Sequence, residues 1–424
     1  MKRIALLSAL FLLWPGIAYA GSLQQTIDAL PAGSELELAP AVYREPVSIT
    51  KPLTVIGAPG TVFRVEGESP AISVENTQGV QIRNVEFEGG STALLVKNSE
   101  DITVEEIRIS KAQQGVEVYG SETLTFRKLL LEGADGHYSA KGNGVALYDS
   151  RDVEVADSAI RHMRDGIYAE KTMNLQASGN RIEHSRYGVH LMYSKQADLS
   201  GNGLAGNVAG VMLMMTEDSR IQGNTIREHT SPNASGLVLY DAQDIRVVGN
   251  FISANALGLS LQKVKNSQIE NNKFYGNQIG MEFIRSAENN ETTGNEFTGN
   301  IVQLRSDALG GALAGNYYDD ASLLDLDEDG YGDTPYAAVQ SFGQWMVRKP
   351  VYQYFIEAPA VVLLNEMDRQ MSSMESSVLV DKAPLAKPPA EETPGNAPVS
   401  LWRLLLGAML LAVGGLVWKK ESAA

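Results

Sequence analysis

The segment that decides the fold reads Gly144-Val-Ala-Leu, Gly166-Ile-Tyr-Ala, Gly188-Val-His-Leu, Gly210-Val-Met-Leu, Gly236-Leu-Val-Leu, Gly258-Leu-Ser-Leu and Gly280-Met-Glu-Phe. This glycine-led group returns with a constant spacing, apart from one longer step between Gly210 and Gly236. Alternation of apolar and polar residues indicates short β-strands, and a fixed period of about 22 residues indicates turns that stack to bury a shared core. The sequence therefore predicts an all-β fold, a right-handed parallel β-helix, which is a solenoid of ~22-residue turns.

Asparagines form a second series in the same phase, namely Asn180, Asn202, Asn224, Asn250, Asn272, Asn295 and Asn316. We expect their side-chain amides to stack as a ladder inside the bends between strands. In each glycine-led strand, the first and third residues after the glycine should point inward, and the second and fourth should point outward. Leu213, for example, should lie in the core.

The two ends of the chain carry apolar segments of different kinds. Residues 1–20 have a basic start, an apolar centre and Ala18-Tyr-Ala20, which is the pattern of a signal peptide. Residues 400–420 hold an apolar stretch between tryptophans followed by lysines, which predicts a single transmembrane anchor; a helix buried in a partner protein is the alternative. The expected segments in between are the β-helix over 21–320, a capping or docking segment over 321–380 with a helical arm at Ala360–Met374, and a proline-rich linker over 381–399.

Charge and cysteine content exclude several classes of function. The net charge is −16 at pH 7, which makes nucleic acid an unsuitable partner. The chain has no cysteine, which excludes disulfides, thiolate metal sites and thiol catalysis. Any bound metal must therefore use histidine, methionine, carboxylate or carbonyl ligands.

Histidine and methionine gather on one outward face of the predicted β-helix. The regular step of the repeat should place His190 beside Met212 and Met192 beside Met214, on two adjacent strands. We expect His162 and His184 on the corner leading into this face and His229 in an insertion, as additional ligands. Imidazole and thioethers together favour Cu(I), so the group predicts transient copper binding; apolar contact with a partner is the alternative.

Two turns are longer than the others, and the extra residues lie within Glu132–Asn143 and Glu228–Ser235. Both insertions precede a glycine-led strand, so they should project from the same corner. Repeat proteins usually place such insertions on a working face.

An acidic loop follows the repeats, with Asp325, Asp327 and Asp329 before Gly330 and then Asp333. Alternating carboxylates before a glycine resemble the first half of a calcium loop, because they can converge on one hard cation. The alternative is an acidic loop that caps the end of the β-helix without a metal.

A rival function comes from tyrosines on the same outward face, namely Tyr119, Tyr148, Tyr168 and Tyr240. An aromatic stripe on a β-helix can serve as a platform for sugar rings. A carbohydrate-binding or polysaccharide-degrading β-helix is therefore an alternative, and a surface adhesin is another. Because the repeats hold no paired-carboxylate motif, we expect a protein that is not an enzyme.

The closing segment, Gly315-Asn-Tyr-Tyr-Asp-Asp followed by Asp325-x-Asp-x-Asp-Gly-x-Gly-Asp-Thr-Pro-Tyr336, resembles the signature that closes the NosD family. Tyr318 stands where that family commonly has tryptophan. The resemblance implies a periplasmic β-helix, which the predicted anchor would tether to the inner membrane. It also implies a partnership with the permease and the ATPase of an ABC transporter. The implied task is assembly of the copper–sulfide centre of nitrous oxide reductase, with copper, and also sulfur, as the cargo and a copper chaperone as a further partner.

Overall fold

The structure is a computed structural model that describes residues 22–286, 289–307, 310–321, 323–338, 345, 349–355, 358–371 and 379–389. The chain up to Lys387 forms one compact unit, and only residues 388 and 389 of the second unit are described. The predicted signal peptide (1–20), the anchor (400–420) and residues 390–399 of the linker lie outside the described residues.

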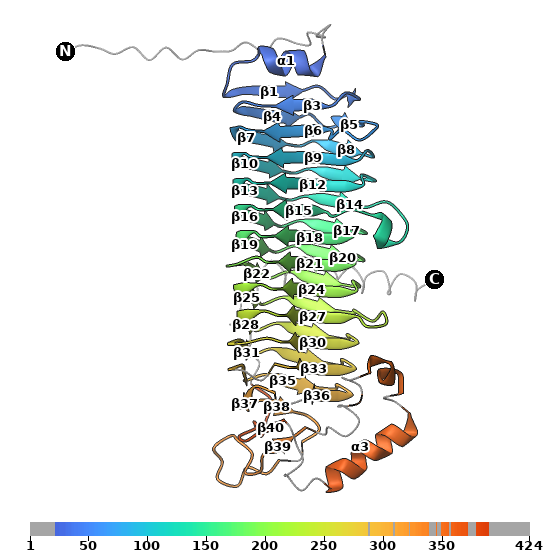
Figure 1. Cartoon of the computed structure of the whole chain (residues 1–424), viewed down its shortest axis with the longest axis vertical. Helices are drawn as coiled ribbons and strands as arrows, with labels where there is room; N and C mark the ends of the chain where they lie inside the picture. Colours follow the sequence, from blue (N-terminus) through green and yellow to red (C-terminus); the bar gives the residue numbers. More distant parts are fainter. Residues whose placement is uncertain are drawn as a thin grey trace, which may run out of the picture. The chain divides into compact units, whose positions relative to one another are not determined.

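Strands from successive turns stack into three sheets within the described residues, here called A, B and C (Figure 1). Sheet A contains, in spatial order, β1 (Ser34–Leu38), β4 (Leu53–Gly57), β7 (Gln78–Arg83), β10 (Glu100–Glu105), β13 (Glu122–Arg127), β16 (Arg151–Ala156), β19 (Met173–Ser178), β22 (Asp198–Ser200), β25 (Glu217–Gln222), β28 (Gln243–Val248), β31 (Gln268–Glu270), β34 (Glu291–Thr293), β37 (Ala312–Ala314), β40 (Val380–Asp381) and β39 (Tyr336–Ala337).

Sheet B contains β2 (Val42–Tyr43), β5 (Val62–Phe63), β8 (Glu86–Glu88), β11 (Arg108–Ser110), β14 (Leu130–Glu132), β17 (Ala159–Arg161), β20 (Arg181–Glu183), β23 (Gly203–Ala205), β26 (Thr225–Arg227), β29 (Phe251–Ser253), β32 (Lys273–Tyr275), β35 (Glu296–Thr298) and β38 (Tyr317–Tyr318). Sheet C contains β3 (Val47–Ile49), β6 (Ile72–Glu75), β9 (Thr92–Lys97), β12 (Gln114–Tyr119), β15 (Val145–Tyr148), β18 (Asp165–Glu170), β21 (Tyr187–Met192), β24 (Ala209–Met214), β27 (Ser235–Tyr240), β30 (Leu257–Gln262), β33 (Ile279–Ile284) and β36 (Val302–Ser306).

Equivalent residues of successive turns pair in parallel, so residues that are one sequence repeat apart lie opposite each other on neighbouring strands. Leu191 on β21 pairs with Leu213 on β24, and Leu213 pairs with Leu239 on β27. All three side chains are fully buried in one core that extends from Ile27 to Leu379. The predicted all-β parallel β-helix and its inward register are confirmed; its right-handedness stays a prediction.

The repeated glycine at the start of each sheet C strand is required by the close approach of neighbouring turns. A Cβ atom on Gly188 would lie 2.5 Å from the carbonyl oxygen of Gly210 and 3.1 Å from the side chain of Leu204. Any larger residue would therefore push adjacent turns apart. This steric limit explains why glycine recurs with the period of the fold.

The asparagine series forms a continuous ladder between sheets A and B. Each side-chain Nδ2 donates to the Oδ1 of the next asparagine along the chain at 2.9 to 3.1 Å, from Asn180 to Asn316. The last amide, of Asn316, donates at 2.9 Å to the carboxylate of Asp381, which is fully buried. The predicted ladder is confirmed, and it ends on a charged acceptor that the sequence did not reveal.

The N-terminal end of the stack is closed by α1 (Leu23–Ala29), which begins at the N-cap Ser22 and buries Ile27. At the other end, β40 pairs with β37 and β39. The first residues of the expected linker over 381–399 therefore belong to the β-helix, because Asp381 pairs inside it. Within the described residues, no helix is long and apolar enough to cross a membrane.

The C-terminal segment before β40 contains η2 (Pro350–Phe355) and α3 (Pro359–Met371). The helix α3 corresponds to the arm expected at Ala360–Met374. Tyr352 of η2 packs against Ile279 on sheet C, as do Leu257 and Val302 from the neighbouring strands. Tyr352 therefore lies against the last turns of sheet C.

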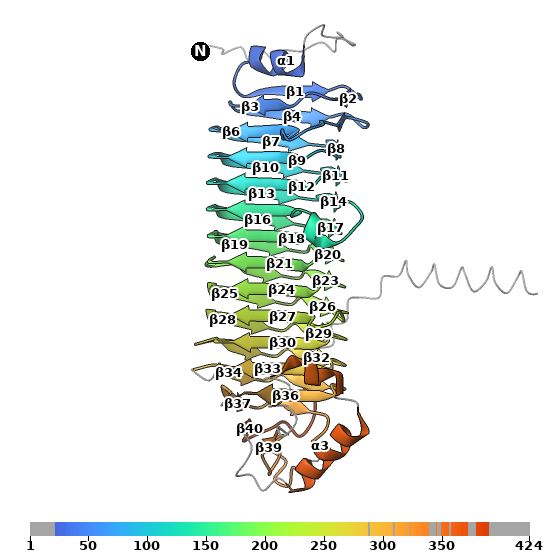
Figure 2. The ribbon, with the colours of Figure 1, turned by 45° about the vertical axis from the view of Figure 1, so that its right-hand side comes forward.

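Both insertions lie at the corner where sheet B leads into sheet C, as the sequence predicts. The first, between β14 and β15, contains the 3-10 helix η1 (Tyr138–Ala140), and Figure 2 shows it looping out from the stack beside β17. The second lies between β26 and β27.

Candidate metal centre

His190 and three methionines lie in register on two adjacent strands of sheet C. His190 on β21 pairs with Met212 on β24, and Met192 pairs with Met214 on the same two strands. Side chains opposite each other on neighbouring strands are ~4.8 Å apart, and those two residues apart on one strand are ~6.6 Å apart. The four residues therefore occupy the two-by-two arrangement that the repeat predicts; whether they bind a metal stays a prediction.

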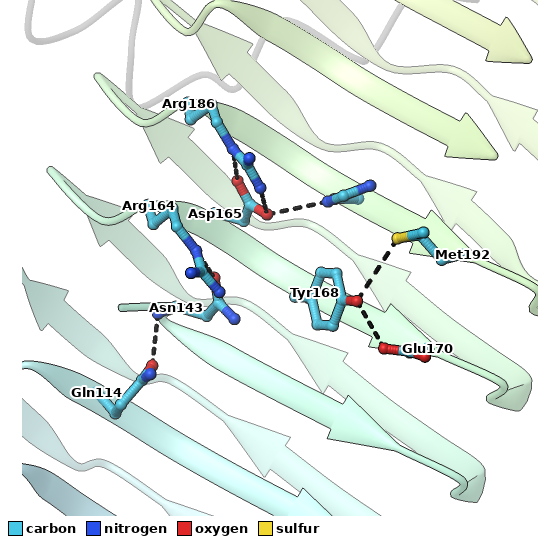
Figure 3. A network of polar contacts seen from close by, with 9 residues as sticks. Gln114, Asn143, Arg164, Asp165, Tyr168, Glu170, Arg186 and Met192 are labelled. Atoms are coloured by element: carbon cyan, nitrogen blue, oxygen red, sulfur yellow. Dashed lines mark hydrogen bonds and ion pairs between the residues drawn. The ribbon is translucent and has the colours of Figure 1, made fainter. Parts of the chain in front are cut away.

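A buried carboxylate fixes the orientation of the His190 ring. Asp165, at the start of β18 one turn earlier, is fully buried, and its Oδ2 lies 2.9 Å from Nδ1 of His190. Arg186 donates to the same carboxylate from Nε to Oδ1 at 2.8 Å and from Nη2 to Oδ2 at 2.5 Å (Figure 3). Burial alone would raise the pKa of Asp165, but the hydrogen bonds from His190 and Arg186 and the charge of Arg186 hold it below its ordinary value.

The second nitrogen of His190 is left without a partner. A carboxylate can only accept, so Nδ1 carries a proton, and in the neutral imidazole Nε2 then carries the lone pair. Nε2 is buried and has no hydrogen-bond partner among the described residues. The rings of Tyr168 and Tyr187 make T-shaped contacts with the imidazole, with centroids 5.1 Å and 4.9 Å away. A buried, oriented lone pair without a donor is the geometry of an imidazole ready for a ligand.

Tyr168 lies between a second carboxylate, Glu170, and the sulfur of Met192. Its hydroxyl donates to Oε2 of Glu170 at 2.8 Å and lies 3.5 Å from the sulfur of Met192 (Figure 3). Burial, the hydrogen bond to Glu170 and its negative charge raise the pKa of Tyr168 well above its ordinary value. The hydroxyl therefore stays protonated and adds no negative charge beside the methionines.

His162 and His184 lie on the corner between sheets B and C, as expected, and they form a pair of their own. Their rings stack with centroids 5.4 Å apart and planes 16° apart. Nδ1 of His162 lies 2.6 Å from Oε1 of Glu132. Among the described residues, no hydrogen bond or ring contact links this pair to His190 or to the methionines.

His229 does not lie on the outer face, and its expected role as an additional ligand there is wrong. Its Nδ1 lies 2.9 Å from the backbone nitrogen of Asn207, and its own backbone nitrogen donates to Oδ1 of Asn255 at 3.0 Å. It therefore fills one position of a second inward ladder, which continues through Asn277. Its side chain is fully buried, and this burial lowers its pKa to about 4, although the hydrogen bond to Asn207 offsets part of that shift.

The acidic loop brings together three of its four expected carboxylates. Oxygens of Asp325, Asp327 and Asp329 lie within 4.8 Å of one another. Asp333 does not join them, because its Oδ2 accepts from the backbone nitrogen of Leu326 at 2.7 Å. Calcium binding by the three carboxylates stays a prediction, and Asp333 holds the loop closed instead.

Within the tyrosine stripe on sheet C, one pair of rings is stacked face to face. Tyr119 and Tyr148 stack face to face, with centroids 4.8 Å apart and planes 8° apart. Tyr148 and Tyr168 follow at 5.6 Å, tilted by 55°. The stacked faces of Tyr119 and Tyr148 are turned on each other, so those two faces are not open to a sugar ring; carbohydrate binding by the stripe stays an untested alternative.

Sequence reasoning missed Asp165 and Arg186, which build the cluster around His190. The two residues are 21 positions apart, close to one repeat, and each lies just before a glycine-led strand. That spacing could have placed them on adjacent turns. It could not show that the guanidinium bends back to the carboxylate instead of extending into solvent.

Comparisons with known proteins match the part of the chain that contains this cluster. The model of the NosD family, described as periplasmic copper-binding protein (NosD), matches residues 129–323. A probable ABC transporter binding protein NosD of Pseudomonas aeruginosa is 28% identical over 131 residues, which is 30% of this chain and 31% of that protein. The protein of the same name from Stutzerimonas stutzeri is 28% identical over 129 residues, 29% of this chain and 30% of that protein.

Among solved structures, the A-module of the mannuronan C-5 epimerase AlgE6 of Azotobacter vinelandii matches with a TM-score of 0.58. It covers 69% of this chain and 92% of that chain at 16% identity, which shows a shared fold alone. The sequence matches span less than a third of each curated relative. They agree with the predicted resemblance: residues 129–323 match the model of the NosD family.

Proposed function

We propose that this chain is a periplasmic protein that takes up Cu(I) on sheet C and passes it on, in cooperation with an ABC transporter, for assembly of the copper–sulfide centre of nitrous oxide reductase. The observation that carries the proposal is the buried Nε2 of His190, which has no partner among the described residues and lies beside three methionines in register. The matching family is described as copper-binding and periplasmic, which supports the same cargo and compartment.

The donor set fits Cu(I) better than other common metal ions. One imidazole nitrogen and up to three thioethers are soft ligands, and soft ligands select Cu(I). Methionine side chains are unbranched and flexible, so Met192, Met212 and Met214 can close on an ion at Nε2 without movement of the strands. The three side chains are only half-buried, so an incoming partner can replace them. We infer weak, reversible binding, which suits a protein that hands its cargo on.

The partners follow from the names of the relatives and from the resemblance of the closing segment. Both curated relatives are named probable ABC transporter binding proteins. We therefore propose the permease and the ATPase of such a transporter as partners, together with a copper chaperone and nitrous oxide reductase itself. We also propose a binding role without catalysis and a tether to the inner membrane through residues 400–420. A sugar-binding function is less favoured, because the faces of the tyrosine rings are stacked on one another.

The proposal is tested by titrating the protein with Cu(I) against a chromophoric chelator. The variant combines Met192→Leu, Met212→Leu and Met214→Leu, which keeps the apolar contacts and removes the sulfurs. The control is Met173→Leu, because Met173 is exposed on β19 of sheet A, away from the cluster. We expect a loss of about tenfold or more in Cu(I) affinity for the triple variant and none for the control.

The same variants should be compared for the copper content of nitrous oxide reductase produced in cells. We expect copper-deficient reductase with the triple variant. If the triple variant keeps both Cu(I) affinity and reductase maturation, the methionines are contact residues and the proposed function is wrong at this site.

A further inference from the structure

Met215 is a fourth methionine next to the candidate metal centre. It directly follows Met214, the last residue of β24, at the corner where sheet C leads into sheet A. Its side chain is half-buried, like those of Met192 and Met214. Three methionines therefore lie at one edge of sheet C, on two consecutive turns.

The backbone of Met215 has a conformation that methionine rarely adopts. Its φ is 49°, in the left-handed region, and the residue that follows each sheet C strand from β6 to β33 shares this conformation. Several of these turns carry the residue types that tolerate it best, namely Asn76, Asn98, Gly120, Asp149 and Asp241. Met215 is the one thioether at this position between Asn76 and Arg285. An unfavourable backbone residue beside a candidate site points to a requirement for its side chain.

Side chains at this edge of sheet C lean towards the preceding turn. The sulfur of Met192 on β21 lies 3.5 Å from the hydroxyl of Tyr168 on β18 (Figure 3). Lys263 follows β30 as Met215 follows β24, and its Nζ lies 5.5 Å from the ring centroid of Tyr240, the last residue of β27. The same lean carries the thioether of Met215 over Met192.

The corner keeps the same backbone geometry in these turns, which supports that comparison. The N–H of Met215 donates to the carbonyl oxygen of Tyr240 at 2.9 Å, and the N–H of Lys263 donates to that of Ile284 at 2.9 Å. Because Met214 also pairs with Met192, both methionines at the end of β24 lie beside the one that ends β21. Three sulfurs can therefore gather at this edge, two residues beyond His190 along the strand.

From this geometry, and resting on the proposed Cu(I) handling, we infer that Met215 completes a second Cu(I) position together with Met192 and Met214. Its ligands are three thioethers, which are uncharged and soft and therefore select Cu(I). Because this outer position has no imidazole nitrogen, it holds the ion more weakly than the position at Nε2 of His190. An ion that moves from His190 to the three methionines reaches the edge of the sheet, where an incoming partner takes it.

The first test isolates the outer position by removing the imidazole. His190→Gln keeps a donor towards Asp165 and removes the lone pair of Nε2. Its Cu(I) affinity is compared with that of His190→Gln/Met215→Leu by titration against a chromophoric chelator, and X-ray absorption at the copper edge identifies the ligands. We expect His190→Gln to retain Cu(I) with sulfur ligands alone, and Met215→Leu to lower that affinity by about tenfold or more.

The second test uses chains with His190 intact and measures the rate at which bound Cu(I) is transferred to the chelator. Met215→Leu and Met215→Asn should both slow this transfer severalfold. Asparagine fits the left-handed backbone, so Met215→Asn should melt at the same temperature as the wild type or higher, which separates loss of the sulfur from loss of the fold. The matched control is Met173→Leu, because Met173 is exposed on sheet A.

The outcomes separate this inference from the proposed function. If the wild type binds Cu(I) but folded His190→Gln does not, or if both Met215 variants transfer copper as fast as the wild type, Met215 is a packing residue and the outer position is refuted, while copper binding at His190 stands. Circular dichroism reports folding, and if His190→Gln does not fold, the transfer rates decide. If the wild type does not bind Cu(I) at all, the proposed function itself falls.

Discussion

Replacing His229 with asparagine should remove an acid-sensitive position from the inside of the β-helix. His229 interrupts an inward ladder whose other members include Asn207 one turn before and Asn255 one turn after. An asparagine at this position can repeat the contacts that Asn255 makes to Asn277, where Nδ2 donates to Oδ1 at 3.0 Å. Unlike histidine, it does not take up a proton in mild acid, so the sensitivity should disappear.

The size of the effect follows from the two protonation equilibria. The ordinary pKa of the imidazole is 6.5, and burial lowers it to about 4 in the folded chain. Between these values the unfolded chain binds a proton that the folded chain does not, so the stability present above pH 6.5 is lost progressively as the pH falls towards 4. Each tenfold difference in proton affinity is worth about 1.4 kcal/mol, which gives a total of about 3 kcal/mol. About 2 kcal/mol of this should already be lost at about pH 5.

The assay is urea unfolding, followed by far-ultraviolet circular dichroism at about pH 7.5 and at about pH 5. Other groups also respond to acid, but they do so equally in both proteins, so the difference between wild type and His229→Asn isolates this side chain. The space left by the smaller residue affects both pH values alike and cancels in the same way. His137→Asn is the matched control, because His137 is exposed in the first insertion. If wild type and His229→Asn lose the same stability between the two pH values, His229 is not buried as a neutral side chain.

Three further changes test the fold and its C-terminal end. Leu213→Asp should lower the free energy of unfolding by about 3 kcal/mol or more, because it buries an unpaired charge in the core; Thr225→Asp at an exposed position of β26 is the control, and equal urea midpoints for the two variants would contradict the inward register. Calorimetry should show calcium uptake by the acidic loop that disappears in Asp327→Ala; no heat and no effect of a chelator on thermal stability would leave an acidic turn. Asp381→Ala should cost about 1–3 kcal/mol, because it leaves buried donors of Asn316 unpaired; an unchanged midpoint in urea would show that the ladder needs no charged end.

The fold and the centre of the candidate site could be predicted from the sequence because both depend on one period. In a parallel β-helix, residues one turn apart in sequence are neighbours in space, so reading the sequence one repeat at a time gives the strand register directly. Leu213 in the core, the ladder from Asn180 to Asn316, and His190 beside Met212 all follow from that rule.

Only the tertiary structure decided the features for which that rule fails. Asn207 and His229 are 22 residues apart, one regular repeat, but His229 and Asn255 are 26 apart because the second insertion follows His229. The longer step made His229 look like part of the insertion and not like a member of the ladder. Asp381 returns to the end of the ladder after a long stretch of irregular chain, a separation that no repeat predicts. The pairing of Asp165 with Arg186 depends on which way a long side chain bends, and burial of the carboxylate makes that contact favourable. The sequence by itself determined the path of the backbone and which residues are paired on neighbouring strands. The tertiary structure decided which side chains contact His190 and fix its orientation, because those contacts depend on burial and on the direction of long side chains.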